Sequence, residues 1–178
     1  MNRFTQLFID KLRTWLPQRD ALIAHPWLKP FADRLRDPHL WRLQQEPVAR
    51  GVAVGIFWAF VIPVAQSVVA VVHCTWWRAN IPAALAMTLI TNPLTIGFWL
   101  WLAYQLGSWL IGAPADAAMS ADGALASWIA AHGGPLLLGI GIFAFGGAAV
   151  GYWSVKLIWV VRVWLRRRVH RKPGRKLA

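Results

Sequence analysis

The chain has 178 residues, of which 57% are hydrophobic and only 15% are charged. Roughly a quarter of the residues in a soluble globular domain are charged, so this composition argues against an ordinary soluble domain and favours a membrane protein. Thirteen tryptophans agree with that assignment, because tryptophan is enriched where a bilayer meets water. The length allows a single domain.

The net charge of +12 is concentrated at the two ends of the chain. Residues 1–50 hold nine Lys/Arg and five Asp/Glu, whereas residues 162–176 hold eight Lys/Arg and no acid. Such a basic tail can bind nucleic acid, but directly after an apolar span it is more typical of an anchor that contacts anionic lipid headgroups. We therefore expect both termini in the cytoplasm and no nucleic-acid partner.

The N-terminal region predicts an amphipathic helix over residues 4–15. Its apolar side chains recur at helical spacing, and it either lies on the membrane surface or packs against the rest of the protein. Five prolines between residues 17 and 47 then predict short helical pieces at the interface. The apolar residues of the first helix are Phe4, Leu7, Phe8, Leu12 and Trp15.

Prolines and polar residues divide the apolar middle of the chain into segments. The first three segments are shorter than the roughly 20 residues that a spanning helix needs, so they are predicted to be half-helices. Residues 113–134 are rich in small residues and lack Lys and Arg, which predicts a loop. The predicted helical segments are 51–62, 63–77, 82–91, 92–112 and, opening at Pro135, 135–162.

The positions of the charges limit the topology. Two cytoplasmic ends require an even number of crossings, with the loop at 113–134 outside. In the simplest arrangement, residues 51–77 form a re-entrant hairpin that turns near Pro63 and returns Arg78 to the cytoplasmic side. Residues 82–112 then cross once, broken at Asn92, and residues 135–162 cross back. A four-crossing arrangement is the alternative, and it requires the short 82–91 segment to cross alone.

The segment "TNPLT" at residues 91–95 carries the strongest indication of a site. Asn92 is a strong N-cap residue, and Pro93 suits the first position of a helix. The hydroxyls of Thr91 and Thr95 can bond nearby carbonyl groups. A helix that starts inside the apolar region would direct its N–H groups and partial positive charge at an anion. Discontinuous helices of this kind occur at transporter binding sites.

Three further polar residues lie next to the other breaks and could converge with Asn92 on an anionic headgroup. They also have simpler explanations: a proline kink whose Asn satisfies its own turn, a glutamine that bonds a neighbouring helix, and an interfacial arginine. The sequence leaves both interpretations open. The three residues are Gln66, Arg78 and Asn80.

Catalysis and metal binding have little support in the sequence. The apolar spans contain no acid, and no nucleophile motif, phosphate-binding loop or metal-ligand spacing of histidines is present. Cys74 is the single cysteine, so no intrachain disulfide can form, and its apolar neighbours predict a buried thiol. We therefore expect a protein that is not an enzyme and has no cofactor or metal.

Three stretches resemble the bacterial DUF2062 membrane family: "PHLWRLQQEPVARGVAVGIFWAFVIPVAQ", "RANIPAALAMTLITNPLT" and "YQLGSWL". The resemblance covers about residues 38–112. Ala65 stands where the family often has glycine, and Leu89 where it commonly has tryptophan before the "NPLT" element. The resemblance implies an inner-membrane protein. Related domains are joined to sugar-transferring enzymes, which implies work near lipid-linked saccharides or envelope assembly.

The expected fold is all-α: an integral membrane protein with discontinuous or re-entrant helices and an amphipathic N-terminal surface helix. Its expected parts are an interfacial region at 1–47, a membrane domain at 48–163 and a basic cytoplasmic tail at 164–178. The expected function is to bind or translocate an anionic lipid, with a polyprenyl phosphate as one candidate, in a homo-oligomer in the bacterial inner membrane. The alternative is a scaffold that recruits an envelope glycosyl-transfer enzyme.

Overall fold

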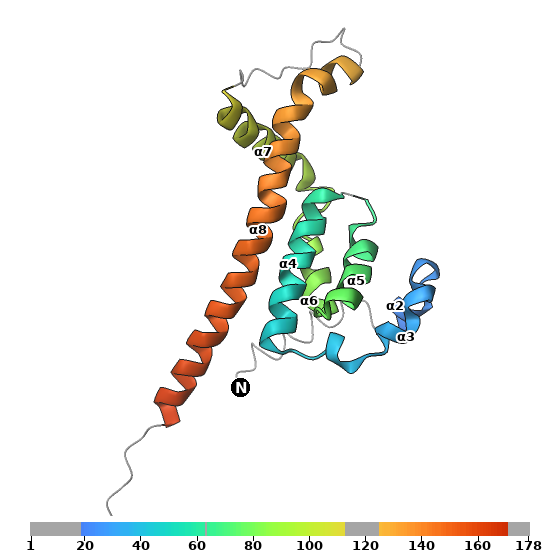
Figure 1. Ribbon diagram of the computed structural model, residues 1–178, viewed down its shortest axis with the longest axis vertical. Coiled ribbons are helices and arrows are strands. Elements are labelled where there is room, and N and C mark those ends of the chain that lie inside the picture. The colour runs from blue at the N-terminus through green and yellow to red at the C-terminus, as the bar shows by residue number, and fades with distance from the viewer. Residues whose placement is uncertain (1–18, 63, 113–124, 171–178) are drawn as a thin grey trace, which may run out of the picture.

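The computed structural model describes residues 19–62, 64–112 and 125–170. Within these ranges every regular element is a helix, which confirms the all-α prediction. The helices form a bundle beside one long helix, α8, which runs the length of the molecule (Figure 1). The amphipathic helix predicted at residues 4–15 lies outside the described residues, as does the end of the basic tail.

The prolines between residues 26 and 38 give the short helical pieces that the sequence predicts. These pieces are α2 (Arg19–Ala24), η1 (Pro26–Phe31), α3 (Ala32–Leu35) and η2 (Pro38–Leu40). Pro26 and Pro38 each stand at the start of a 3₁₀ helix, where the missing N–H is not needed. The buried leucines of these four short helices pack into the same core as residues of α5. This core also contains Cys74, which is fully buried as expected. These leucines are Leu22, Leu28, Leu35 and Leu40.

Helices α4 (Gln45–Val61) and α5 (Gln66–Trp77) form a hairpin. Its two ends meet where the Asn80 N–H donates to the Pro47 carbonyl at 2.8 Å, so the chain returns to its starting level as the sequence predicts. Helix α4 begins at Gln45, six residues before the predicted start at Gly51. Pro47 is compatible with this earlier start, because a first-turn N–H has no partner within its helix.

Helix α6 (Ile81–Thr88) starts at the base of the hairpin, and α7 (Ile96–Ile111) follows after a break. Pro82 lies in the first turn of α6, and the Asn80 side chain caps it by accepting the Ala83 N–H at 2.9 Å. Helix α6 packs closely on α4, since a Cβ at Gly55 would lie only 2.7 Å from the Met87 Cβ. The discontinuity predicted within residues 82–112 is therefore present.

Helix α8 (Leu125–His170) has 46 residues. The prediction of a loop over 113–134 is wrong from Leu125 onward, and Pro135 lies inside a helix instead of opening one. Gly134 removes the Cβ that would clash with the proline ring, so the helix continues through this position. Helix α8 packs first on α7 and then on α4, and its C-terminal end projects beyond the bundle (Figure 1).

Among the described helices, one segment is long and apolar enough to cross a membrane: Gly133–Leu165, with 33 residues. Only 17% of its apolar window is buried in the protein, whereas the core helix of a soluble protein is mostly buried. Helix α7 is also apolar but shorter. The predicted boundaries at 47/48 and 163/164 stay predictions, and both fall within continuous helices, α4 and α8.

Candidate functional site

Four polar side chains from α4 and α8 form a bonded cluster. Glu46 Oε1 accepts hydrogen bonds from Tyr152 Oη at 2.8 Å and from Arg50 Nε at 3.1 Å, and Oε2 lies 2.9 Å from Lys156 Nζ. The Lys156 Nζ also lies 4.8 Å from the centre of the Tyr152 ring. One carboxylate thus joins two cations, which leaves the cluster with a net charge of +1.

This cluster holds the Glu46 carboxylate in its charged form. The hydrogen bond from Lys156, followed by that from Tyr152, lowers the pKa of Glu46 from 4.5 to about 2. The side chain is 40% exposed, so the cluster is open to solvent or to a headgroup. Arg50 also donates from Nη1 to the Trp77 carbonyl at 3.2 Å, which fixes the guanidinium between α4 and α5. Its Nη2 bonds no other described residue.

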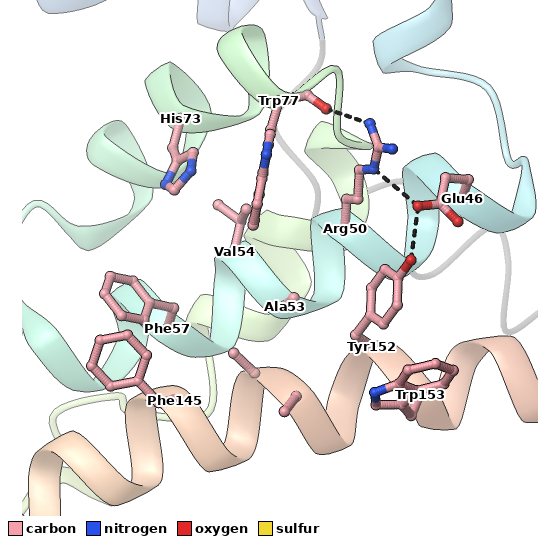
Figure 2. Close-up of a pocket in the computed structure, with 12 residues that line it drawn as sticks. Glu46, Arg50, Ala53, Val54, Phe57, His73, Trp77, Phe145, Tyr152 and Trp153 are labelled. Carbon is pink, nitrogen blue, oxygen red and sulfur yellow. Dashed lines mark hydrogen bonds and ion pairs between the residues drawn. The ribbon is translucent and has the colours of Figure 1, made fainter.

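Beside the cluster lies a pocket of about 690 Å³ between α4, α5 and α8 (Figure 2). The walls away from Glu46 and Arg50 are apolar or aromatic. Phe57 and Phe145 meet edge to face across the α4–α8 contact, with ring centroids 5.2 Å apart. The remaining lining residues are Ala53, Val54, His73, Trp77, Ala148, Ala149, Tyr152 and Trp153. The pocket therefore has the polarity of an amphiphile: one charged end and apolar walls.

Glycines on α8 set the width of this pocket. Gly151 faces Ile56 and Val52 of α4, and a Cβ there would lie 2.6 Å from the Ile56 Cδ1. Gly147 faces the same isoleucine. The backbones of α4 and α8 can therefore approach closely, as small residues permit between membrane helices. That approach brings Glu46 within reach of Tyr152 and Lys156, which are more than 100 residues away in sequence.

His73 and Trp77 of α5 form the wall opposite α8. The Trp58 Nε1 donates to His73 Nδ1 at 2.8 Å, so the neutral His73 ring carries its proton on Nε2. The His73 and Trp77 rings lie 5.2 Å apart and tilted by 32°. Neither the Nε2–H of His73 nor the Nε1–H of Trp77 has a hydrogen-bond partner among the described residues. Both donors are held on rigid rings at the pocket wall.

The structure brings two of the residues predicted to form a site into one network. Gln66 Nε2 donates to the carbonyls of Thr88 and Thr91 at 2.8 and 3.1 Å. The Thr91 hydroxyl lies 3.0 Å from Gln66 Oε1 and 2.7 Å from the Ala59 carbonyl. Gln66 and the 95% buried Thr91 thereby satisfy carbonyls where α4 and α6 end. Their side chains tie three helices together.

Asn92 and Thr95 form a closed turn. Asn92 Oδ1 accepts the N–H groups of Leu94 and Thr95 at 2.9 and 3.0 Å, and the Asn92 carbonyl accepts the Ile96 N–H at 2.9 Å. The Asn92 side chain thus caps the turn before α7, whereas the N-cap position of α7 is Thr95, whose side chain makes no capping bond. The predicted helix start at Pro93 is wrong, because α7 begins at Ile96 after this turn. The N–H groups of Leu94 and Thr95 are bonded to Asn92 itself.

Asn80 and Arg78 lie at the other end of α6. Asn80 is fully buried, and its Nδ2 donates to the Arg42 carbonyl at 3.1 Å while its Oδ1 caps α6. The Arg78 side chain is 71% exposed and lies 3.8 Å from the Asp37 carboxylate. The eight residues of α6, about 12 Å at 1.5 Å per residue, separate these two from Thr91. The seven predicted residues therefore do not converge on one point.

Sequence reasoning did not identify the cluster around Glu46. Two signals were available: the i,i+4 spacing of Glu46 and Arg50, and Lys156 as a lone cation in the last apolar span. Neither reveals the pairing between α4 and α8, because their contact joins residues 110 positions apart.

Together, the fold and the pocket define a class: a small all-helical protein with one long, largely exposed apolar helix and an amphipathic pocket beside it. The profile of the family described as "Uncharacterized protein conserved in bacteria (DUF2062)" matches residues 28–168. The chain belongs to this family, as the resemblance of its motifs indicated. Comparison with curated proteins and with solved structures gives no significant match.

Proposed function

We propose that the protein is a non-enzymatic integral protein of the bacterial inner membrane that binds an anionic lipid in the pocket between α4, α5 and α8. The observation that carries the proposal is the pocket itself, with its apolar walls and with Arg50 and Glu46 of the charged cluster among its lining residues. Binding is the function for which the described residues offer a shaped site. Translocation of the lipid and assembly of several chains remain parts of the proposal to be tested after binding.

The exposure of α8 supports a location in the membrane. Between Leu137 and Leu165 the helix presents many large apolar side chains, among them Phe145 at 69% and Trp153 at 66% exposed. A continuous apolar surface of this size is unusual for a soluble monomer and typical of a surface covered by lipid or by another protein. The apolar window of Gly133–Leu165 is largely outside the protein core, which fits contact with lipid.

The distribution of charge supports the two-crossing topology. Glu46 and Arg50 at the start of α4 lie level with Lys156 of α8. The α4–α5 hairpin returns Arg78 to that end, where it meets Asp37. The basic residues of α8 from Arg162 onward follow on the same side. With the cytoplasm at this end, the hairpin is re-entrant and α8 crosses the membrane above Lys156.

The charges of the cluster, of which Arg50 and Glu46 line the pocket and Lys156 pairs with Glu46, favour an anionic headgroup. Lys156 has N–H groups beyond the one directed at Glu46, and Arg50 Nη2 bonds no other described residue, so both can donate to a phosphate. The cluster carries a net charge of +1, which suits a ligand with one negative charge. An acyl or isoprenoid chain would lie between Phe57, Phe145 and Trp77.

Asn92 takes a smaller part in this proposal than the sequence suggests. Its side chain already bonds the N–H groups that an anion would need. Gln66 and Thr91 bond each other and nearby carbonyls. We therefore propose that the "TNPLT" segment fixes the break between α6 and α7, and that the pocket holds the lipid.

Native mass spectrometry of the gently extracted protein tests this proposal. Wild type should retain an anionic lipid in preference to phosphatidylethanolamine, and Arg50→Gln should reduce that retention severalfold. Arg36→Gln is the matched control, because this exposed arginine of the N-terminal helical region does not line the pocket. Asn92→Ala serves as a second control.

The outcomes separate the two candidate positions. Loss of the lipid in Arg50→Gln, with retention in both controls, supports the pocket. Loss in Asn92→Ala alone would move the site to the broken helix. Equal, non-selective retention in all four proteins would refute lipid binding as the function. Tryptophan fluorescence melts of each variant show whether the fold is intact.

One observation favours a second candidate, a membrane scaffold. The α8 segment from Leu157 to Leu165 projects beyond the bundle, and its apolar side chains are exposed (Figure 1). This segment leads into the basic tail, so together they offer a surface for an envelope enzyme. Replacing exposed Leu157 and Ile158 by Ser should then abolish function in a cell-based assay while lipid retention stays unchanged. Unchanged function would refute the scaffold.

A further inference from the structure

The pocket wall on α5 contains polar groups that the proposed headgroup contacts do not use. His73 Nε2–H and Trp77 Nε1–H are adjacent donors, on rings 5.2 Å apart, without partners among the described residues. His73 is bonded through Nδ1 to Trp58, eight residues along α4 from Arg50. At 1.5 Å per residue this places the level of Trp58 about 12 Å along the helix from Arg50.

These donors are held in place. The His73 ring is fixed by the hydrogen bond from Trp58. It also meets the Trp58 ring edge to face, with the two ring centroids 6.0 Å apart. Trp77 stacks against the other side of His73 and ends α5, where its carbonyl accepts from Arg50. Rotation of either ring to find another partner would break these contacts. An acceptor inside the pocket, which both residues line, can satisfy the two donors while they keep this geometry.

We propose that the pocket takes a lipid with oxygen atoms beyond its headgroup, an ester-linked acyl lipid, and that His73 and Trp77 donate hydrogen bonds to its ester carbonyls. This inference rests on the proposed lipid binding. It distinguishes between two kinds of anionic lipid. An ester-linked acyl lipid has carbonyl oxygens outside its headgroup, whereas a polyprenyl phosphate carries all its oxygens in the phosphate group. Such a chain would offer neither N–H donor an acceptor, and a donor that the chain covers would be left unpaired at a cost in free energy.

The experiment compares an ester lipid with an ether lipid that lacks only the carbonyls, and adds a polyprenyl lipid as a third ligand. Full-length protein in nanodiscs of neutral lipid is titrated with ester-linked phosphatidylglycerol, with its ether-linked analogue of equal chain length, and with a polyprenyl monophosphate. Wild type should bind the ester at a Kd about three- to tenfold lower than the ether, which is the effect of losing a hydrogen bond. The polyprenyl monophosphate should bind more weakly than the ester.

Two variants connect the preference to the donors. His73→Phe and Trp77→Phe keep an aromatic ring and remove one N–H each. Each should therefore reduce the ratio of the affinity for the ester lipid to that for the ether lipid toward one. His73→Gln should restore part of it, because its amide supplies a donor at a similar position. Trp101→Phe is the control, an exposed tryptophan of α7 that does not line the pocket. Melts of every variant confirm that the fold is retained.

The possible results are distinguishable. A wild-type ester preference that both phenylalanine variants lose supports the inference. Equal binding of ester and ether lipids, tighter binding of the polyprenyl lipid, or a preference that survives in both variants overturns it and leaves lipid binding by the pocket standing. Absence of selective binding to any of the three lipids overturns the proposed function and the inference together.

Discussion

The contact between α7 and α8 gives the sharpest structural prediction, because it depends on a missing side chain. A Cβ at Gly139 of α8 would overlap the carbonyl oxygen of Ala103 on α7, whereas a Cβ at Gly141, two residues along, would meet nothing. Gly139→Ala therefore requires the helices to separate by roughly 1 to 2 Å before ordinary contact distances return. Gly141→Ala requires no movement, and alanine is the better helix former.

The expected size follows from this overlap. Inserting a methyl group into a closely packed interface costs typically 1–3 kcal/mol, which corresponds to a decrease in Tm of about 2 to 12 °C for a chain of this length. Gly141→Ala should leave Tm unchanged or slightly raised. The measurement is tryptophan fluorescence during thermal unfolding in one detergent, for wild type and both variants. Equal melting of Gly139→Ala and Gly141→Ala would show that α7 and α8 are not in backbone contact.

Three further variants test the polar contacts. Because the pKa of Glu46 is lowered from 4.5 to about 2, its stabilisation is complete above about pH 4.5 and is lost as the pH falls through about 2. Glu46→Gln should therefore melt lower than wild type at pH 7, with most of this difference gone at about pH 2, and a constant difference would contradict the ion pair. Gln66→Leu leaves the Thr88 and Thr91 carbonyls without the Gln66 amide and should cost about 1–3 kcal/mol in denaturant unfolding, more than the about 1 kcal/mol expected for Asn92→Ala. Asn80→Ala removes a buried cap and the bond to the Arg42 carbonyl, so a melt equal to wild type would refute its role.

The sequence predicted the helices well wherever local chemistry decides them. Pro82 with Asn80 marks the start of α6, and Asn92 marks the break before α7. Boundaries that depend on tertiary contacts were missed. Ala65 and Arg78 adopt left-handed backbone conformations at the ends of α5, with φ of 58° and 51°, although nothing in these residue types indicates it. Pro135 was predicted to start a helix, because proline is common at the start of helices. The structure shows that α8 continues through Pro135, which follows Gly134.

The candidate site was less predictable than the fold. Gln66 and Thr91 were predicted as ligand contacts at the breaks, and in the structure their partners are mostly backbone carbonyls, which a sequence pattern does not display. Glu46 and Lys156 have opposite charges and lie 110 positions apart, so composition alone cannot pair them. The pocket depends on how closely α4 approaches α8, which the glycines of α8 permit without specifying the partner helix.

The order of the helices has a consequence for biosynthesis. Helices α4, α5 and α6 contact one another within residues 45–88, so this part of the fold can form while the rest of the chain is still being made. Glu46 and the α4 face at Ile56 acquire their α8 partners only after residue 156 has left the ribosome. The pocket is thus completed only when α8 has been synthesised. A chain that ends before α8 keeps His73 and Trp77 on α5 but lacks the opposite wall, so the proposed lipid site exists only once α8 has packed on α4.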